Sequence, residues 1–279
     1  MGEEQTKDRA PTADGDRSAG GVRTLERGLA LLSCFDVNHP SWTLADLSRA
    51  VNLHKATARR LAKTLEAQRF LRVDELTGQY RLGTALLPMT YLARSNDELV
   101  HVAHPYVERL AEQTQETVGF SVWTDGGIVQ IDHVLTTHLF KPQMLLGSVT
   151  SEYGTTHSKI FLAFGPEDRL SRLTWGSPMH SLTVADAATL REELDRVRER
   201  GIAIDVEERM PGVCAVGVPV RDSVGEVVAS IAVVVPKDRF RPEDRRRLAL
   251  SAYEAATALS RDLGFRGTDF PPPALDEDV

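Results

Sequence analysis

The sequence predicts an α+β protein with two parts, an N-terminal winged helix-turn-helix and a larger domain built on a mixed, mainly antiparallel sheet. Apolar residues recur at helical spacing through residues 22–68, and two short alternating segments follow before residue 82. From residue 117 the apolar period changes from 3.6 to 2, and helical patterns flank the alternating segments. A chain of 279 residues with 42% apolar residues has room for two such cores.

Residues 22–68 contain three predicted helices. The first is a support helix over residues 22–35, with an inner face formed by Leu25, Leu29, Leu32 and Phe35. The second follows Thr43, where Asp46 completes a capping-box pattern. A turn at residues 52–54 leads to the third helix, residues 55–68, whose outer face is basic. Two helices joined by such a turn place the second one in the DNA major groove, so the third helix is the candidate recognition helix.

A two-stranded wing is predicted after this helix, because alternating residues surround a turn at residues 74–78. Lysine and arginine pair readily with guanine acceptors, so Lys55 and Arg59 are expected to contact bases. Arg60 either binds phosphate or braces the helix, and Thr57 either caps the helix or bonds a phosphate. The predicted DNA-binding residues are Lys55, Ala56, Thr57, Arg59, Arg60, Arg72 and Arg81. The alternative is an ordinary helical hairpin with solvated basic residues, which does not account for the wing.

Charge is segregated along the chain, whose net formal charge is −7. Residues 22–82 carry 10 Lys/Arg against 6 Asp/Glu, residues 1–21 carry 3 against 5, and residues 83–279 carry 20 against 29. A basic module joined to an acidic body is typical of a protein that touches phosphates at one end only.

Cysteine usage and the chain ends bound the class of protein. Cys34 and Cys214 provide neither a disulfide framework nor a zinc-finger spacing, which fits a reducing cytoplasm. No apolar run reaches the length of a membrane span, and the polar N-terminus lacks the pattern of a signal peptide. A cytoplasmic protein without a membrane partner is therefore expected. Residues 1–21 and 267–279 are predicted to be disordered tails.

The winged module, residues 22–82, is followed by a predicted linker helix over residues 83–96. This helix is more apolar than a solvated linker, so it packs either on its own domain or, as we favour, against a partner subunit. Residues 97–266 form the larger, sensor-like domain. Its predicted elements are helices at 97–116, 151–164, 170–174, 184–200 and 243–262 and strands at 117–124, 128–134, 144–149, 202–205, 213–220 and 227–235.

Two other classes of function are conceivable from the sequence, a metal-dependent or catalytic protein and a sensor that acts through protein contacts. His101 and His104 lie one helical turn apart, with Asp97 a turn earlier, and such residues can hold a metal. Paired histidines on a helix surface are usually not ligands, and no catalytic motif such as GxSxG, a P-loop or HExxH is present. Neither a cofactor nor enzymatic activity is expected. A small-molecule sensor acting through protein contacts remains the alternative, although the basic helix argues against it.

Seven short segments, taken together, resemble the IclR family of bacterial transcription regulators. In the N-terminal part they are RGLALL at 27–32, KATARRL at 55–61 and GQYRLG at 78–83. In the C-terminal part they are TTHSKIFLA at 155–163, RGIAID at 200–205, PGV at 211–213 and AVGVPV at 215–220. Each segment alone is weak, but their joint order and spacing make the resemblance specific.

The resemblance implies a winged helix-turn-helix followed by an effector-binding domain of GAF-like fold. It also implies a homodimer, or a dimer of dimers, on a partly palindromic double-stranded DNA operator. A small organic effector would modulate the affinity for the operator, and members act as repressors or activators. His54 departs from the Pro or Ser that usually begins the recognition helix in the family, and both of those are better helix starts.

The family's effector site implies a set of contact residues in this chain. They are Gly147, Tyr153, Thr155, Thr156, His157, Asp205, Val213, Ala215, Ala232 and Val234. Some carboxylate-binding members have Cys at the position of Ala215 and Ser at the positions of Ala232 and Val234. Because an unpaired carboxylate is costly to bury, losing these donors favours a larger, more apolar or aromatic acid. Asp205 could instead cap a turn, and His157 could bond its own backbone at a helix start.

Overall fold

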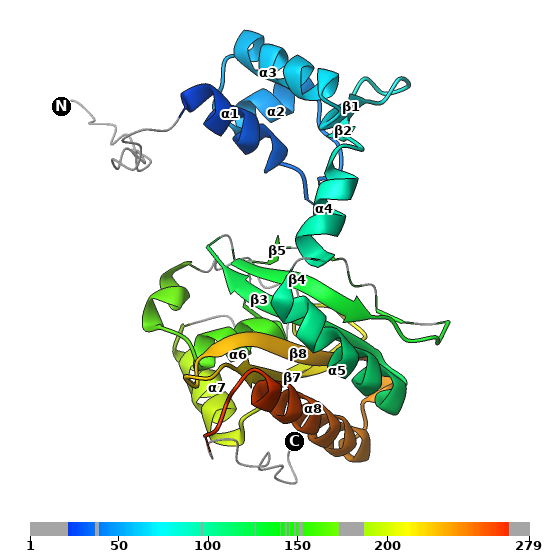
Figure 1. Cartoon of the computed structure of the whole chain (residues 1–279), viewed down its shortest axis with the longest axis vertical. Coiled ribbons are helices and arrows are strands. Elements are labelled where there is room, and N and C mark those ends of the chain that lie inside the picture. Colours follow the sequence, from blue (N-terminus) through cyan, green and yellow to red (C-terminus); the bar gives the residue numbers. More distant parts are fainter. Residues whose placement is uncertain are drawn as a thin grey trace, which may run out of the picture. The chain divides into compact units, whose positions relative to one another are not determined.

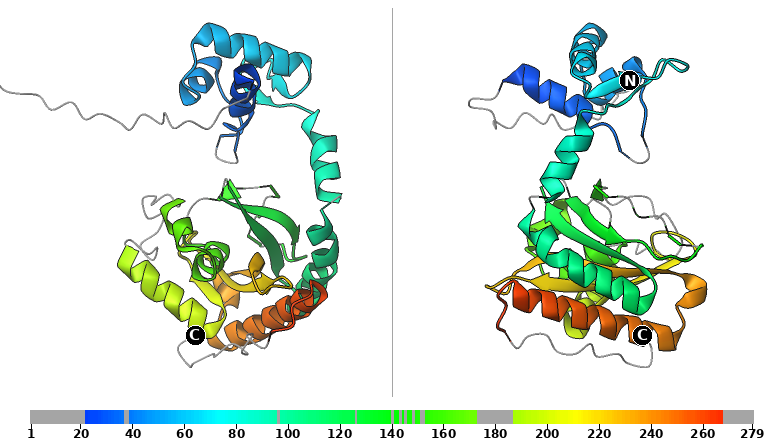
Figure 2. Two further views of the ribbon diagram at one scale, coloured as in Figure 1. Left: turned by 60° about the vertical axis from the view of Figure 1, so that its left-hand side comes forward. Right: turned by 45° about the vertical axis from the view of Figure 1, so that its right-hand side comes forward.

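The computed structural model describes residues 22–36, 39–95, 97–125, 127–139, 141–142, 144, 146–147, 149–150, 153–172 and 187–267 (Figures 1 and 2). The tails that were predicted to be disordered, residues 1–21 and 267–279, lie outside these residues apart from Gly267. The chain divides into two compact units, Met1–Pro88 and Met89–Val279.

The N-terminal unit has the predicted order of elements. It contains helices α1 (Arg23–Leu32), α2 (Leu44–Ala50) and α3 (Lys55–Ala67) and strands β1 (Leu71–Val73) and β2 (Tyr80–Leu82). The strands pair antiparallel and form the predicted wing. Trp42 and Tyr80 exchange two backbone hydrogen bonds, at 3.0 and 2.8 Å, which tie the segment before α2 to the wing. The helical core is formed by Leu31, Leu47 and Leu61.

The predicted inner face of the first helix is wrong at two positions. Leu25 and Leu29 are 61% and 54% exposed, whereas Gly28 and Leu31 are buried. Both rows along α1 carry apolar residues, so helical periodicity alone does not select the buried one. Packing of Leu31 against Leu47 of α2 and Leu61 of α3 selects the buried row.

The two helices of the helix-turn-helix begin as the sequence predicts. Thr43 Oγ1 accepts a hydrogen bond from the backbone N–H of Asp46 at 3.2 Å, so Thr43 caps α2. Asn52, in the turn, has a φ of +50°, a conformation that asparagine tolerates better than most residues. His54 precedes α3 without a side-chain capping hydrogen bond. The predicted inner stripe of α3 is buried at Ala58, Leu61 and Ala62.

The C-terminal unit is built on a six-stranded sheet in the order β5-β4-β3-β8-β7-β6. The strands are β3 (Thr117–Thr124), β4 (Gly127–Val134), β5 (Val149–Thr150), β6 (Ala203–Val206), β7 (Val213–Arg221) and β8 (Val227–Pro236). The helices are α5 (Glu98–Thr114), α6 (Thr156–Ala163), η1 (Glu167–Arg172), α7 (Ala187–Arg200), η2 (Lys237–Arg239) and α8 (Pro242–Asp262), and α4 (Leu86–Ser95) spans the boundary between the units. Every pairing between the described strands is antiparallel.

Helices cover both faces of this sheet (Figure 2). Alternate strand residues such as Val216, Val218 and Ile231 pack against α5 and α8 in the main core. A second cluster, which includes Ile160 and Leu194, joins α6 and α7 to the opposite face. Since neighbouring strand residues point to opposite faces, the residues of β7 and β8 between those of the main core face α6.

The helices of this unit depart from the predicted boundaries most clearly at α6 and η1. α6 begins at Thr156 rather than near residue 151, because Thr155 caps it through a capping box with Ser158. The helical pattern predicted at 170–174 corresponds to η1. The predicted start of the helix at 184–200 lies outside the described residues, and α7 is described from Ala187.

The predicted strand at residues 144–149 is wrong over most of its length. β5 comprises only Val149–Thr150. Gly147 lies in a turn with a φ of +74°, and its N–H donates to the carbonyl of Gln130 at 2.8 Å. An apolar run suggested a strand here, but a backbone turn at the glycine interrupts it.

Candidate functional site

The outer face of α3 is a basic surface. Lys55, Arg59, Arg60 and Lys63 are exposed, as is Ala56, while Thr57 is half-buried. The buried row of α3 fixes the helix against α1 and α2, so these basic side chains point away from the core. The arrangement provides cations at the N-terminal half of the second helix of a helix-turn-helix, where base edges are contacted.

The wing brings two arginines together. Arg72 of β1 lies directly opposite Arg81 of β2 in the register. Arg72 is exposed, and Arg81 Nε lies 3.4 Å from Asp74 Oδ2. Like charges directly opposite each other on two strands repel, and one carboxylate offsets only part of that repulsion. The wing is therefore a place where an anion is favoured.

In the C-terminal unit, the start of α6 is held tightly against the sheet. Thr155 Oγ1 accepts from the N–H of Ser158 at 3.1 Å, and the N–H of Thr155 donates to Ser158 Oγ at 3.0 Å. Thr156 rests on β7: a Cβ at Gly217 would lie 2.6 Å from Thr156 Cβ. Glycine at this position is what allows α6 to approach the strand so closely.

Three of the predicted effector residues form a small, apolar surface beneath the start of α6. Ala215 pairs with Val234, and Ala232 pairs with both Gly217 and Gly119 across three adjacent strands. None of these five side chains carries a polar group. We call this surface the floor, defined as Gly119, Ala215, Gly217, Ala232 and Val234.

His157 lies beside the floor and is 9% exposed. Within the described residues neither of its ring nitrogens has a hydrogen-bond partner, so the alternative that it bonds its own backbone is wrong. Burial lowers the pKa of His157 to about 4. The ring is therefore neutral near pH 7.

Three residues of this site were missed by the sequence analysis. They are Gly119, Gln130 and Met144. A Cβ at Gly119 would lie 3.4 Å from Gln130 Nε2 and 3.5 Å from His157 Nε2, and the methyl group of Met144 occupies that same place. No local motif marks these residues, because the strand register and a long connection bring them together.

The remaining predicted effector residues lie elsewhere around the site. Tyr153 is buried in the second core cluster, with α6 and α7. Gly147 is bonded to β4 through its backbone and is exposed. Val213 begins β7 and is paired with Pro236.

Asp205 is nearly buried and caps a turn, as one of the two alternatives predicted. Its Oδ1 accepts the backbone N–H of Glu208 at 2.8 Å. Burial raises the pKa of Asp205 to about 7. Asp205 also pairs with Ala215 in the sheet, which places it at the edge of the floor.

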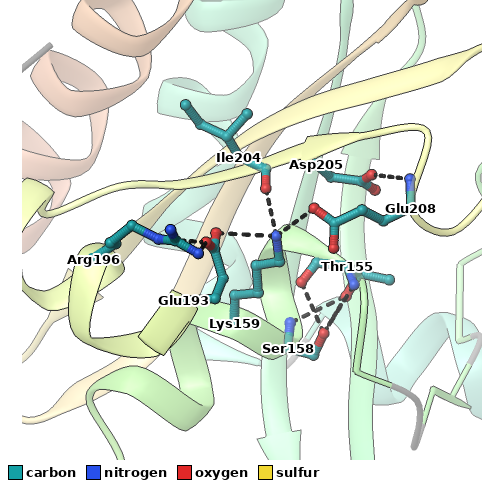
Figure 3. Close-up of polar contacts among 8 residues, drawn as sticks. All are labelled: Thr155, Ser158, Lys159, Glu193, Arg196, Ile204, Asp205 and Glu208. Carbon is teal, nitrogen blue, oxygen red and sulfur yellow. Dashed lines mark hydrogen bonds and ion pairs between the residues drawn. The ribbon is translucent and has the colours of Figure 1, made fainter. Parts of the chain in front are cut away.

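A buried lysine that the sequence analysis did not single out organises this side of the sheet (Figure 3). Lys159, 1% exposed, donates to Glu208 Oε1 at 2.6 Å, to the carbonyl of Ile204 at 2.7 Å and to Glu193 Oε1 at 3.3 Å. One ammonium group thus joins α6, α7, β6 and the turn after β6. Burial raises the pKa of Glu208, and the neighbouring Lys159 opposes that shift.

Of the three residues weighed as a possible metal site, Asp97 and His104 are engaged in other contacts. Asp97 caps α5 by accepting from the N–H groups of Leu99 and Val100, at 3.0 and 3.2 Å. His104 Nδ1 lies 2.7 Å from the buried Asp132 Oδ2. In the described part of the chain, no group of three His, Cys, Asp or Glu side chains is arranged to hold a metal ion. In the same part, none of the helices has the length and apolarity that crossing a membrane requires.

Comparison with known proteins agrees with this two-part organisation. Residues 24–75 match the IclR helix-turn-helix domain, and residues 90–261 match the family described as bacterial transcriptional regulator IclR C-terminal. The DNA-binding transcriptional repressor YiaJ of Escherichia coli is 30% identical over 257 residues, which cover 89% of this chain and 90% of the relative.

Solved structures give the same picture. The crystal structure of Thermotoga maritima IclR has a TM-score of 0.64 at 26% identity and covers 87% of this chain and 99% of that chain. An IclR homologue of Microbacterium hydrocarbonoxydans in complex with 4-hydroxybenzoate has a TM-score of 0.66 at 21% identity and covers 86% and 98%. The chain belongs to the IclR family: it is a DNA-binding transcriptional regulator with an effector-binding C-terminal domain.

Proposed function

We propose that this regulator reads its operator with Lys55 and Arg59 of α3. The observation that carries this proposal is the exposed basic face of α3, whose opposite face is buried in the helical core. Arg60 and Thr57 would contact phosphates next to the bases, and the small, exposed Ala56 would lie close to the groove.

The wing would bind the DNA backbone. A phosphate between Arg72 and Arg81 relieves the repulsion of two arginines that face each other across the strand pair. Such contacts position the N-terminal winged helix-turn-helix, which we call the head, on the duplex, and they carry no base preference of their own.

We also propose that the regulator works as a homodimer joined in part through α4. Leu87, Met89, Tyr91 and Leu92 of α4 are between 53% and 72% exposed in the single chain. Four large apolar side chains on ten residues of helix are typical of a surface that a second protein covers. Two heads held together in this way match a partly palindromic operator.

The effector site would lie on the floor, next to His157, Thr156 and Asp205. The floor offers only apolar surface, so it favours a ligand with a sizeable apolar or aromatic body. 4-Hydroxybenzoate, which one structurally similar protein binds, is a ligand of this kind. Effector binding alters DNA affinity only to the extent that it favours one arrangement of the dimer over another.

The test is fluorescence-anisotropy binding of the purified protein to fragments of its own upstream region, with scrambled DNA as the control. We expect sequence-selective binding that weakens steeply as the salt concentration rises, because phosphate contacts release counterions. Salt-independent behaviour, with no affinity for any DNA, would contradict the proposal. It would favour a sensor that acts through protein contacts.

A further inference from the structure

A buried histidine with unused hydrogen-bonding groups lies next to the proposed effector site. His157 is 9% exposed, and its Nδ1 and Nε2 have no hydrogen-bond partner within the described residues. Buried polar groups in proteins nearly always have a hydrogen-bond partner, so a buried imidazole without one requires an explanation. A ligand that supplies the missing partner is such an explanation.

The ring of His157 is aimed at the floor. Its Nε2 lies 3.5 Å from the place that a Cβ on Gly119 would occupy, and the amide nitrogen of Gln130 lies 3.4 Å from the same place. The methyl group of Met144 fills this place in the free protein. A methionine side chain is flexible and easily repacked, so a ligand group can displace the methyl and meet both nitrogens.

The backbone at this point favours negative charge. His157 lies in the first turn of α6, an eight-residue helix capped by Thr155. The N-terminus of a helix carries a partial positive charge, which attracts an anion and disfavours an imidazolium. The side chain of His157 adds a polar group of its own to the backbone N–H groups at this helix end.

The buried cation of α6 is already neutralised, so it does not offset the charge of a ligand bound on the floor. On the α6-facing side, the residues of β3, β7 and β8 are uncharged except for Arg221, which lies over the ring of Phe164 at the other end of α6. Lys159 of α6 is committed to Glu193 of α7 and to Glu208. The other titratable groups here are Asp205 on β6 and His133 on β4, whose Nδ1 lies 3.3 Å from Gln130 Nε2.

We propose that the effector is a carboxylate with an apolar body that enters together with one proton, shared between its carboxylate and His157. This inference rests on the proposed effector site. An anion alone would be buried without a counter-charge, whereas an anion plus a proton adds no net charge to the floor. In the complex, the proton lies in the hydrogen bond between the ring and the carboxylate.

The direction of the pH dependence follows from the state of the free protein. Burial lowers the pKa of His157 to about 4, so the ring of the free protein is neutral at pH 7 and the proton must come from solvent. Protons become scarcer as the pH rises. The dissociation constant should therefore increase about tenfold for each pH unit between about 5.5 and 8.

Isothermal titration calorimetry of the full-length protein tests this inference. The probes are benzoate and phenylacetate, each paired with its uncharged amide, with propionate as a short acid. Titrations in phosphate and in Tris at the same pH give the number of protons taken up, because the two buffers differ in their heat of ionisation. We expect about one proton per aromatic acid, and at least tenfold weaker binding of the amides and of propionate.

Three variants assign the proton to a residue. His157→Gln should abolish the proton uptake and the pH dependence, and its melting curve checks that the domain still folds. His138→Gln, at an exposed histidine of the same unit, should behave as the wild type. Asp205→Asn tests the neighbouring group, whose pKa burial raises to about 7: it distinguishes a proton taken up at Asp205 from one taken up at His157.

The inference would be overturned by acid binding without proton uptake, by equal binding of the amides, or by an unchanged His157→Gln variant. Uptake that is lost in Asp205→Asn and kept in His157→Gln would assign the proton to Asp205 and would overturn it as well. If no probe binds, the inference fails for this class of ligand. The DNA-binding assay still decides the proposed function, so the two failures are distinguishable.

Discussion

Arg59 is the residue of α3 at which a substitution best distinguishes a base contact from a phosphate contact. It is exposed and lies one helical turn after Lys55, at the end of the helix where bases are read.

We predict that Arg59→Ala costs about 1–3 kcal/mol of binding free energy on the cognate operator and relaxes the preference at one base pair. Anisotropy titrations against operator variants measure both effects. Arg246→Ala, at an exposed arginine of the C-terminal unit, serves as the matched control and should leave binding unchanged. An equal loss on every sequence would identify Arg59 as a phosphate contact instead.

Lys159 shows how much can depend on one buried charge. It is 1% exposed, and the two glutamates that it binds, Glu193 and Glu208, are themselves mostly buried. Removing the ammonium leaves both carboxylates without their shared counter-charge, and breaking a buried ion pair in this way is strongly destabilising.

We predict that Lys159→Met lowers the free energy of unfolding by about 3–5 kcal/mol at pH 8. The loss should be smaller near pH 5, because burial already raises the pKa of Glu208 and the variant raises it further. A carboxyl whose pKa is raised in the folded state destabilises as the pH rises through that pKa. Urea unfolding at the two pH values measures the difference. Lys237→Met, which removes an exposed lysine paired with Glu207, should cost much less, and an effect equal to that of Lys159→Met would contradict the argument.

Among the elements, α6 contacts both the floor of the candidate effector site and the turn after β6. Its first turn carries Thr156 and His157 beside the floor, and Lys159 reaches the turn after β6. The position of this helix depends on a close approach to β7, which Gly217 permits.

We predict that Gly217→Ala destabilises the C-terminal unit by about 1–3 kcal/mol, since the added methyl would lie 2.6 Å from Thr156 Cβ and force α6 outward. The thermal unfolding midpoint should fall. Gly28→Ala in α1 is a useful contrast, because nothing lies within 4 Å of the added carbon and alanine favours a helix. Its midpoint should stay the same or rise, and similar losses in both variants would refute the steric explanation.

Most elements could be predicted from the period of apolar residues, and the failures have physical causes. β3 has the predicted bounds, and β7 and β8 extend one residue beyond theirs. The buried row of α1 could not be predicted, because two apolar rows compete and only packing against α2 and α3 decides between them. The prediction of a strand at 144–149 was wrong over most of that range, because the apolar composition gave no sign of the turn at Gly147.

The residues of the DNA-binding surface could be predicted from the sequence more fully than those of the effector site. The basic residues of α3 follow from a local pattern, since they share one helix face. Gly119, Gln130 and Met144 had no such signal, because strand pairing over long sequence separations brings them to His157. The unpaired state of His157 also depends on three-dimensional surroundings, and the sequence left two interpretations open.

For the whole molecule, the main expectation concerns assembly. We predict that Tyr91→Glu in α4 shifts the regulator from dimer toward monomer and weakens operator binding by at least tenfold, because a charge in an apolar interface is costly and each head alone reads half a site. Analytical ultracentrifugation measures the first effect and anisotropy the second. Leu139→Glu, at a fully exposed leucine, is the control and should change neither. A wild type that is monomeric while binding its operator would refute the assignment.

The strand order also governs how the chain acquires its structure during synthesis. The central ladder pairs Thr117 of β3 with Val234 of β8, so the sheet cannot close until most of the chain has left the ribosome. The winged head depends on contacts within its own unit and emerges first. A nascent or prematurely terminated chain can therefore hold a finished head before the effector domain exists, and such a fragment would bind half a site weakly and without responding to any ligand.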